Sequence, residues 1–475
     1  MILTTENFNG PETIKALSGN VLNTRFEDLE PALVDNTKRR ILDMIGCCIG
    51  GSNEPGNSVL AEMVGKGGGK GDATLLGYGY KAPVDLAAMI NCLFGRSFDW
   101  GPLVVIMDDG VRHASHNSET TVPTAITVGA CKGISGKELI TALVAGDDLV
   151  ARVQIGSGGE HPGTMQAKPA IRRAGFDEWG TKTAFGATAI AGRLFGLTEF
   201  QMKNALGIAV NMMAGTAGGL VEGATTFKLS QGTAARSGIN AAQLAKGGWI
   251  GVSDPLSAYY NAFTRGLTQP DLITRDLGKK YYVEQVFKPW PGGRPTNAAT
   301  QLAITMAKKY DLKPDDIAEA IYRTSEGIAT APHYTKPYKV GLYPTGDALF
   351  SFVYAIANGL STRASKGDNF TEEGIRNPQT QALIRRVTLA SLDKPEGVEL
   401  EVRMKDGRQY SEYLRMAVGD PSNPLSREGL IEKFMNQVEF SKKVSKTNAE
   451  KIIEMVEKLE KVDNIQKIID LAIIK

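Results

Sequence analysis

Residues 398–416, VELEVRMKDGRQYSEYLRM, decide the predicted fold class because they contain the clearest β-hairpin of the sequence. Two strand-like arms, 398–405 and 408–416, are separated by Asp406-Gly407. An Asp-Gly pair readily adopts the positive φ angles of a type I′ turn, which joins antiparallel strands. We therefore predict a hairpin here, in a chain whose other patterns are mostly helical.

Short strand and helix patterns continue on the N-terminal side of this hairpin. Residues 317–324 and 386–392 have the composition of strands, whereas 297–309 and 347–360 have helical patterns. Such alternation is typical of an α+β domain. We predict this domain over residues 284–419.

The sequence on both sides of this domain carries helix signals. Ser135 with Glu138, and Thr198 with Gln201, have the spacing of a capping box, in which each side chain bonds the other residue's backbone N–H. Ser426 is placed to cap a later helix. Further helical runs cover residues 37–46, 86–94, 234–246 and 452–469. The prediction is a mainly α protein, in which an all-α domain formed by both chain ends, 1–283 and 420–475, carries the inserted α+β domain.

Composition excludes several function classes. The 475 residues include 54 Lys plus Arg and 52 Asp plus Glu, for a net charge of +2. Without a basic cluster, no nucleic-acid partner is expected. The longest uncharged stretch, 205–221, is broken by glycines, and the start MILTTENFNG lacks a signal-peptide pattern, so no membrane association is expected. The four cysteines have neither zinc nor redox spacing, which predicts a reduced, cytoplasmic protein.

Two of the four histidines lie in a polar segment that could carry chemistry. His113 and His116 belong to RHASHNSETTVP, just before a helix that we expect to start near Pro123. A helix N-terminus favours the neutral imidazole, which is a usable base at pH 7. These histidines could instead bind a metal with Asp99, Asp108 and Asp109, although no third nitrogen or sulfur ligand is evident. His161, in the Gly-rich loop GGEHPGTM, is expected at the surface, and His333 in APHYTK allows either interpretation.

Three cations lie in stiff turns near helix starts. Lys228 is in TTFKLSQGTAARSG, and Lys288 and Arg294 are in FKPWPGGRPTN. Lys and Arg held in this way suit the binding of carboxylate substrates. Solvated cations at domain edges are the alternative.

Eight segments in this order resemble the MmgE/PrpD family across nearly the whole chain. They are ILDMIGCCIGG, GRSFDWGP, HNSETTVPTAITVGA, FGATAIAGRLFGLTEFQMKNALGIA, FKLSQGTAARSGINAAQLA, FKPWPGGRPTN, LFSFVYAIANGL and GDPSNPLSREGLIEKF. The family includes 2-methylcitrate dehydratase, cis-aconitate decarboxylase and iminodisuccinate epimerase. The resemblance implies activity without a metal or organic cofactor on a small di- or tricarboxylate. It also implies a homodimer, with the α+β domain acting as a lid over the helical domain.

The resemblance also implies individual site residues. Asp99 falls on the first Asp of an acidic DFDD-like run, and His116 falls on the active-site His seven residues before the Pro of Val-Pro. Lys288 matches the Lys that opens the KP-aromatic-P turn, and Tyr354 matches a Tyr that faces the site from the lid. Lys228 lies one position closer to the following Gly than the family's Lys does.

Three departures from the family pattern concern the same site. Asp177, in GFDEWG, stands where the decarboxylases have a second active-site His, and Asn297 replaces another His. Trp100-Gly101-Pro102 replaces the rest of the acidic run. These departures leave open which activity of the family this chain has.

The shared chemistry of the family is proton transfer at a carbon next to a carboxylate, where cations must stabilise the developing charge. We expect His116 to be the general acid or base and Asp99 to orient it. Lys288, Arg294 and Lys228 would bind carboxylates, and Tyr354 would donate to the leaving group or return a proton.

A dehydratase or decarboxylase is the first hypothesis for this chemistry. Asp177 as a second base would suit an epimerase or isomerase, which is the second. A catalytically silent homologue, suggested by Asp177 and Asn297, is the third.

Overall fold

The computed structural model describes residues 8–67, 71–108, 111–157, 175–264, 269–283, 285–325, 334, 338–394 and 396–474. His161, His333 and Asp109 lie outside these ranges, and the side chains of Asp108 and His113 are not described. The predicted mainly α fold is confirmed, with helices dominating and strands confined to small sheets. Within the described ranges, no helix has both the length and the apolar character needed to span a bilayer.

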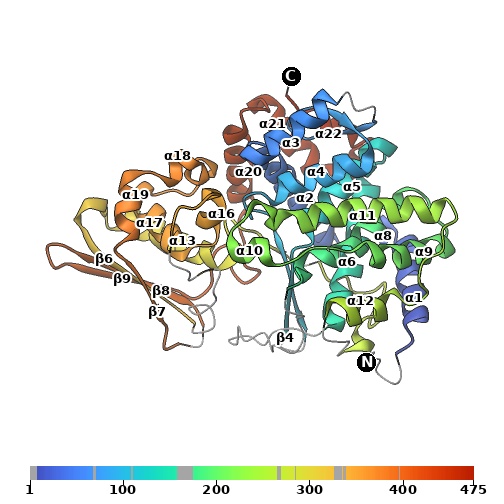
Figure 1. Cartoon of the computed structure of the whole chain (residues 1–475), viewed down its shortest axis with the longest axis horizontal. Helices are drawn as coiled ribbons and strands as arrows, with labels where there is room; N and C mark the ends of the chain where they lie inside the picture. The colour runs from blue at the N-terminus through green and yellow to red at the C-terminus, as the bar shows by residue number, and fades with distance from the viewer. Residues whose placement is uncertain are drawn as a thin grey trace.

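The larger part of the molecule is a helical body (Figure 1). Its main N-terminal helices are α1 (Gly10–Asn23), α2 (Pro31–Gly51), α3 (Pro55–Lys66), α4 (Val84–Arg96), α5 (Ser118–Lys132), α6 (Gly136–Gly156), α8 (Thr183–Leu194), α9 (Glu199–Ala209), α11 (Leu229–Lys246) and α12 (Pro255–Phe263). Small residues let these helices approach closely. A Cβ atom on Gly238 of α11 would lie 2.7 Å from the backbone nitrogen of Thr188 in α8, so a larger residue would separate the two helices.

The C-terminal helices return to this body, in Figure 1 beside α2 and α3. They are α20 (Arg427–Ser441), α21 (Lys446–Glu457) and α22 (Gln466–Ile469). Gln437 of α20 lies against Gly46 of α2, where an added Cβ would overlap its amide. Both chain ends thus build one body. Ser426 caps α20 as predicted, but the run expected over 452–469 is interrupted between α21 and α22.

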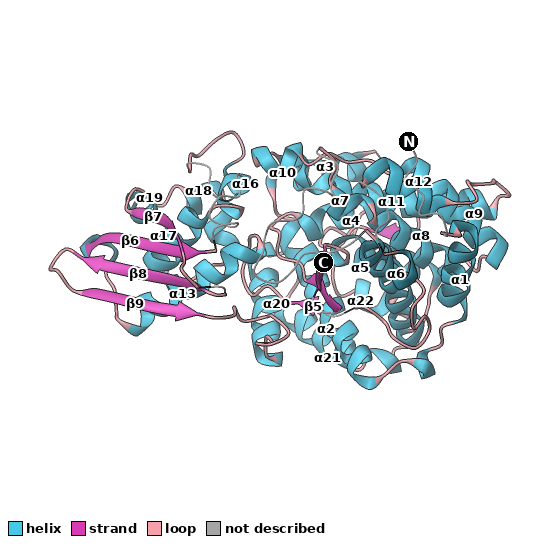
Figure 2. Ribbon diagram, turned by 90° about the horizontal axis from the view of Figure 1, so that it is seen from below, coloured by secondary structure: helices cyan, strands magenta, loops and turns pink. Residues whose placement is uncertain are grey.

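The predicted α+β segment forms a four-stranded sheet covered by helices (Figure 2). The strands β6 (Ile317–Thr324), β7 (Val387–Ser391), β8 (Val398–Met404) and β9 (Gln409–Leu414) lie in the order β7-β6-β8-β9, and only β6 and β7 pair in parallel. The helices include α13 (Arg294–Lys309), α16 (Pro344–Leu349), α17 (Phe352–Thr362) and α19 (Pro378–Ile384). Alternate residues of β8 are buried, so one face packs inward. On the other face Arg323 pairs with Glu399 and Glu401.

Three local predictions need correction. The 398–416 hairpin is present, but Gly407 has a positive φ and Asp406 does not, so the connection is longer than a type I′ turn. The helix predicted over 347–360 breaks into α16 and α17, because Ser351 caps a new helix. The Ser135 hydroxyl caps α6 as expected, but Glu138 pairs with Arg193 instead of completing the capping box. Thr198 and Gln201 do form the complete box.

Two small sheets in the helical body were not predicted from the sequence. One pairs β1 (Ala73–Thr74) with β2 (Lys81–Ala82). The other has the order β4-β3-β5, from β3 (Leu103–Asp108), β4 (Val111–Ser115) and β5 (Gln285–Val286). Strand β3 is an almost continuous apolar run, β4 has two adjacent polar residues and β5 has only two residues, so none of them shows a two-residue alternation. This second sheet places the candidate site.

Candidate active site

Asp99, His116 and Lys288 meet at one edge of the β4-β3-β5 sheet. Strand β3 is antiparallel to both neighbours, so its start lies beside the ends of β4 and β5. Asp99 precedes β3, whereas His116 directly follows β4 and Lys288 follows β5 by two residues. The pairing of short strands therefore joins three residues that the sequence analysis selected separately.

Asp99 is the centre of this cluster. Its buried carboxylate oxygen Oδ1 accepts a hydrogen bond from Lys288 Nζ at 2.9 Å and also pairs with the Arg96 guanidinium. Burial raises the pKa of Asp99, but Arg96 and Lys288 outweigh burial and hold this pKa well below its usual range. Asp99 also has a φ of 45°, a left-handed conformation that an Asp tolerates better than most residues. The carboxylate is therefore ionised and held from both sides.

His116 is positioned by the start of α5. This helix begins at Ser118, five residues before the expected start, and contains Pro123 within it. The imidazole Nδ1 lies 2.9 Å from Glu119 Oε1 and 4.0 Å from Asp99 Oδ1. The side chain is 16% exposed, and its ring meets Trp179 edge to face at 5.6 Å. His116 and Lys288 thus both lie within 4.0 Å of the same Asp99 oxygen.

Glu119 and Arg96 are site residues that the sequence analysis missed. Glu119 is fully buried, and its Oε1 lies 3.7 Å from Arg96 NH1. Burial raises the pKa of Glu119, but His116 and Arg96 lower it by a larger amount, so the net shift of this pKa is downward. A helix start placed at Ser118 would have put Glu119 in the first turn, next to His116.

Asp177 borders the same cluster, near Arg96. It caps the short helix α7 (Glu178–Thr181), accepting bonds from the backbone nitrogens of Trp179 (3.2 Å) and Gly180 (3.3 Å). Its charge also acts on Arg96. The helix cap explains an Asp at this position.

Lys228 reaches the edge of the site at the seam with the α+β segment. Its ammonium pairs with buried Glu54 and lies 3.4 Å from Ser97 Oγ, two residues from Asp99. Tyr343, from the α+β segment, lies close enough to Glu54 for that carboxylate to raise the tyrosine's pKa, in addition to the larger effect of burial. Burial lowers the pKa of Lys228, although Glu54 opposes this.

No described contact brings Arg294 or Tyr354 to His116. The Arg294 guanidinium pairs with Asp420. The Tyr354 hydroxyl donates to the Asn369 carbonyl, and its ring stacks on Tyr338 at 5.6 Å inside the α+β segment. The structure therefore places both predicted residues in other contacts.

A different tyrosine, Tyr334, lies within electrostatic reach of the site. Burial raises its pKa, the Asp99 charge raises it further, and Arg96 lowers it. Its hydroxyl lies over Gly293, where an added Cβ would be 2.4 Å away. Gly293 caps α13, in the turn that carries Lys288.

Asn297 holds this turn together. Its amide oxygen accepts from Trp290 N at 3.2 Å, and its Nδ2 donates to the carbonyls of Trp290 and Gly293, each at 3.2 Å. The Asn297 side chain is buried. Its structural task is to shape the loop from which Lys288 projects.

Asp99, His116 and Glu119 are also the one group among the described residues whose ligand atoms could surround a metal ion, all within 4.8 Å of one another. Their surroundings suit a cation poorly. Lys288 already bonds Asp99, and Arg96 lies beside both carboxylates, so a dication would be repelled by two fixed positive charges. The alternative that uses His113 falls on a side chain outside the described part.

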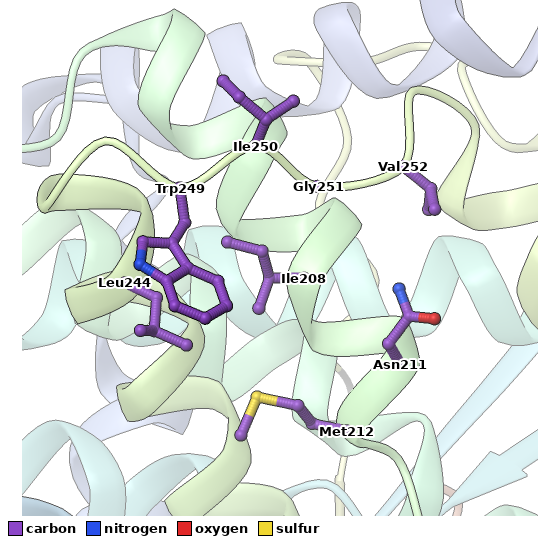
Figure 3. Close-up of a pocket in the computed structure, with 8 residues that line it drawn as sticks. All are labelled: Ile208, Asn211, Met212, Leu244, Trp249, Ile250, Gly251 and Val252. Atoms are coloured by element: carbon purple, nitrogen blue, oxygen red, sulfur yellow. The ribbon is translucent and has the colours of Figure 1, made fainter.

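A separate cavity of about 450 Å³ lies between α9 and the C-terminal end of α11 (Figure 3). Its lining consists of Ile208, Asn211, Met212, Leu244, Trp249, Ile250, Gly251 and Val252. None of these residues is ionisable. The cavity therefore cannot supply acid–base chemistry, and the Asp99 cluster remains the candidate active site.

Comparisons with known proteins give matches over nearly the whole chain. The chain matches the model of the MmgE/PrpD N-terminal domain over residues 15–274 and that of the MmgE/PrpD C-terminal domain over residues 290–461. It is 24% identical to cis-aconitate decarboxylase of Mus musculus over 469 residues, which cover 95% of this chain and 91% of that protein. The Homo sapiens protein of that name is 25% identical, covering 92% of this chain and 89% of its own. The Aspergillus terreus protein is 26% identical over 261 residues, covering 52% and 48% respectively.

Proposed function

The chain belongs to the MmgE/PrpD family, and from this premise we propose that it is a cofactor-independent lyase acting on a small di- or tricarboxylate. Decarboxylation or loss of water would follow proton transfer next to a carboxylate. The observation that carries the proposal is the meeting of His116 and Lys288 at one oxygen of Asp99. This geometry puts a proton-transfer group beside a fixed cation.

In the proposed reaction His116 and Lys288 have separate tasks. His116 moves the proton at the reacting carbon, because an imidazole can both accept and donate near pH 7. Lys288 has three ammonium protons, of which Asp99 takes one, so the others can bind a substrate carboxylate. As the reacting carbon loses its proton or CO₂, negative charge grows on the neighbouring carboxylate, and the buried ammonium stabilises it. Lys228 would bind a second carboxylate at the seam.

Epimerisation is a second candidate, favoured by the position of Asp177. Its carboxylate and the His116 imidazole both lie near Arg96, so two groups able to take a proton border one site. Two such groups are what inversion at a carbon requires. Exchange of substrate hydrogen for deuterium from the solvent, without release of water or CO₂, would identify this reaction.

The test of the main proposal is turnover of a panel of citrate-, aconitate- and succinate-like acids, followed by proton NMR. We expect one of them to lose CO₂ or water, and His116→Asn and Lys288→Met each to lower kcat/KM by at least about 100-fold. Lys458→Met, at an exposed position of the C-terminal segment, is the matched control. Absence of any product would favour the silent homologue, and near-normal turnover by both site variants would show that the site is elsewhere.

Assembly, location and lid motion are part of the same proposal. We propose a cytoplasmic homodimer in which the α+β segment, 284–419, acts as a lid that excludes water from the site. Light scattering would show the dimer mass. Slower backbone hydrogen exchange at the seam, around Glu54 and Tyr343, in the presence of a tricarboxylate would support closure.

A further inference from the structure

We propose that Glu119 is the positioning residue that fixes His116 in one tautomer, with the proton on Nδ1 and the lone pair of Nε2 free to take the substrate proton. The catalytic use of this tautomer rests on the proposed function. The tautomer itself does not, and can be observed without substrate.

The distances select Glu119 over Asp99 as the partner. Glu119 Oε1 is 2.9 Å from His116 Nδ1, which is a hydrogen bond, whereas Asp99 Oδ1 is 4.0 Å away, which is not. The same Asp99 oxygen already accepts hydrogen bonds from Lys288 and Arg96. The orienting task that the sequence analysis gave to Asp99 therefore moves to Glu119.

The chemistry of the pair then sets the position of the proton. An ionised carboxylate only accepts hydrogen bonds, so the proton between Glu119 and His116 belongs to Nδ1. The Arg96 guanidinium, 3.7 Å from the same Glu119 oxygen, favours the ionised form of this carboxylate. A neutral imidazole carries one N–H, and with that proton on Nδ1 the other nitrogen is left as the base. Because Glu119 is fully buried and its helix is fixed, the ring has little freedom to turn.

Gly101 provides the space that this arrangement needs. A Cβ atom at position 101 would lie 2.9 Å from Glu119 Cγ and 3.0 Å from both Cδ and Oε1. These contacts are too short for the Glu119 side chain to stay in place. The Gly of Trp100-Gly101-Pro102, which departs from the family's acidic run, is thus explained by the carboxylate that lies against it.

The experiment is a nitrogen NMR spectrum of the full chain labelled with ¹⁵N-histidine, which has only four histidines to resolve. His116→Asn assigns the signal by its loss. We expect His116 to show a protonated Nδ1 and an unprotonated Nε2 near pH 8. Glu119→Gln, which preserves shape but removes the charge, should abolish this preference, and Gly101→Ala should weaken it. Asp99→Asn should leave it in place.

Kinetics provide the second readout. Glu119→Gln should lower kcat by about 100-fold while KM changes less than about 3-fold, because the substrate does not touch Glu119. Thermal unfolding checks that the variant is folded, and Glu119→Asp is a second variant that keeps the charge and should retain part of the preference. A His116 protonated on Nε2 in the unmodified protein, or a spectrum unchanged in Glu119→Gln, would overturn the inference. If His116 has the expected tautomer but the protein turns over none of the acids, the proposed function is wrong and the inference about Glu119 stands.

Discussion

The Lys433 ammonium donates a hydrogen bond to the carbonyl oxygen of Trp100 at 2.7 Å, across a sequence separation of 333 residues. Lys433 belongs to α20 near the C-terminal end of the chain, and it also pairs with Asp43 of α2 at 2.5 Å. All three groups are buried. Since Trp100 follows Asp99, the C-terminal segment anchors the peptide that carries the centre of the active site.

The anchor should matter for both stability and activity. Lys433→Met would leave the Asp43 carboxylate buried without its cation, which lowers the free energy of unfolding by about 3–5 kcal/mol. Urea unfolding measures this loss. We also expect a lower kcat, because the Trp100 carbonyl loses its hydrogen bond from Lys433 and the neighbouring Asp99 is then less firmly positioned.

The double variant Lys433→Met/Asp43→Asn separates the two effects. It removes the unpaired charge, so stability should recover in part while kcat stays low. A double variant with full activity would show that Lys433 is needed only for folding.

Acid should remove the contribution of Asp99 to stability. Burial raises its pKa, but Arg96 and Lys288 lower it more, so the folded pKa lies below the unfolded value of about 3.9. A depressed folded pKa stabilises the protein above the unfolded pKa, and this stabilisation is lost as pH falls below it. Asp99→Asn should therefore be less stable than the unmodified protein at pH 7, and the difference should shrink towards pH 3. Urea midpoints at pH 7, 5, 4 and 3 give the comparison, and a difference that is constant across this range would contradict the assignment.

Local patterns were enough to predict much of the fold. The 398–416 hairpin, the β6 and β7 strands and the Thr198 capping box all follow from residues within one short stretch. The break between α16 and α17 was missed because the apolar spacing continues across it.

The site was predicted only in part, because its partners come from distant segments. The sequence identifies His116, Asp99 and Lys288 but not Glu119. Its pattern predicts a helix start near Pro123, whereas α5 accommodates this proline in its second turn. In the sequence, Arg96 has the position of an ordinary C-terminal residue of a helix. Its pairing with Asp99 exists only in the folded chain. The ion pairs of Arg294 and Lys228 depend on residues 126 and 174 positions away, which no local pattern shows.

The substrate role proposed for Lys228 can be separated from its structural role. Lys228→Met alone should lower the free energy of unfolding by about 3–5 kcal/mol, because it leaves the Glu54 carboxylate buried without its cation. Lys228→Met/Glu54→Gln should regain most of that loss. If Lys228 binds a substrate carboxylate, KM of the double variant stays raised by about 10-fold or more. An unchanged KM in the refolded double variant would make the pair purely structural.

Two tyrosine variants should tell which hydroxyl serves the reaction. Tyr354→Phe removes one hydrogen bond to the Asn369 carbonyl, which should cost about 1 kcal/mol of stability and leave kcat nearly unchanged. Tyr334→Phe should lower kcat by about 10-fold or more, because this hydroxyl is close enough to Asp99 and Arg96 to feel both charges. Steady-state kinetics at saturating substrate make the comparison, with thermal unfolding as the check on each variant. A larger kcat loss in Tyr354→Phe would restore the role that the family resemblance implies, and would require Tyr354 to leave Asn369 when substrate binds.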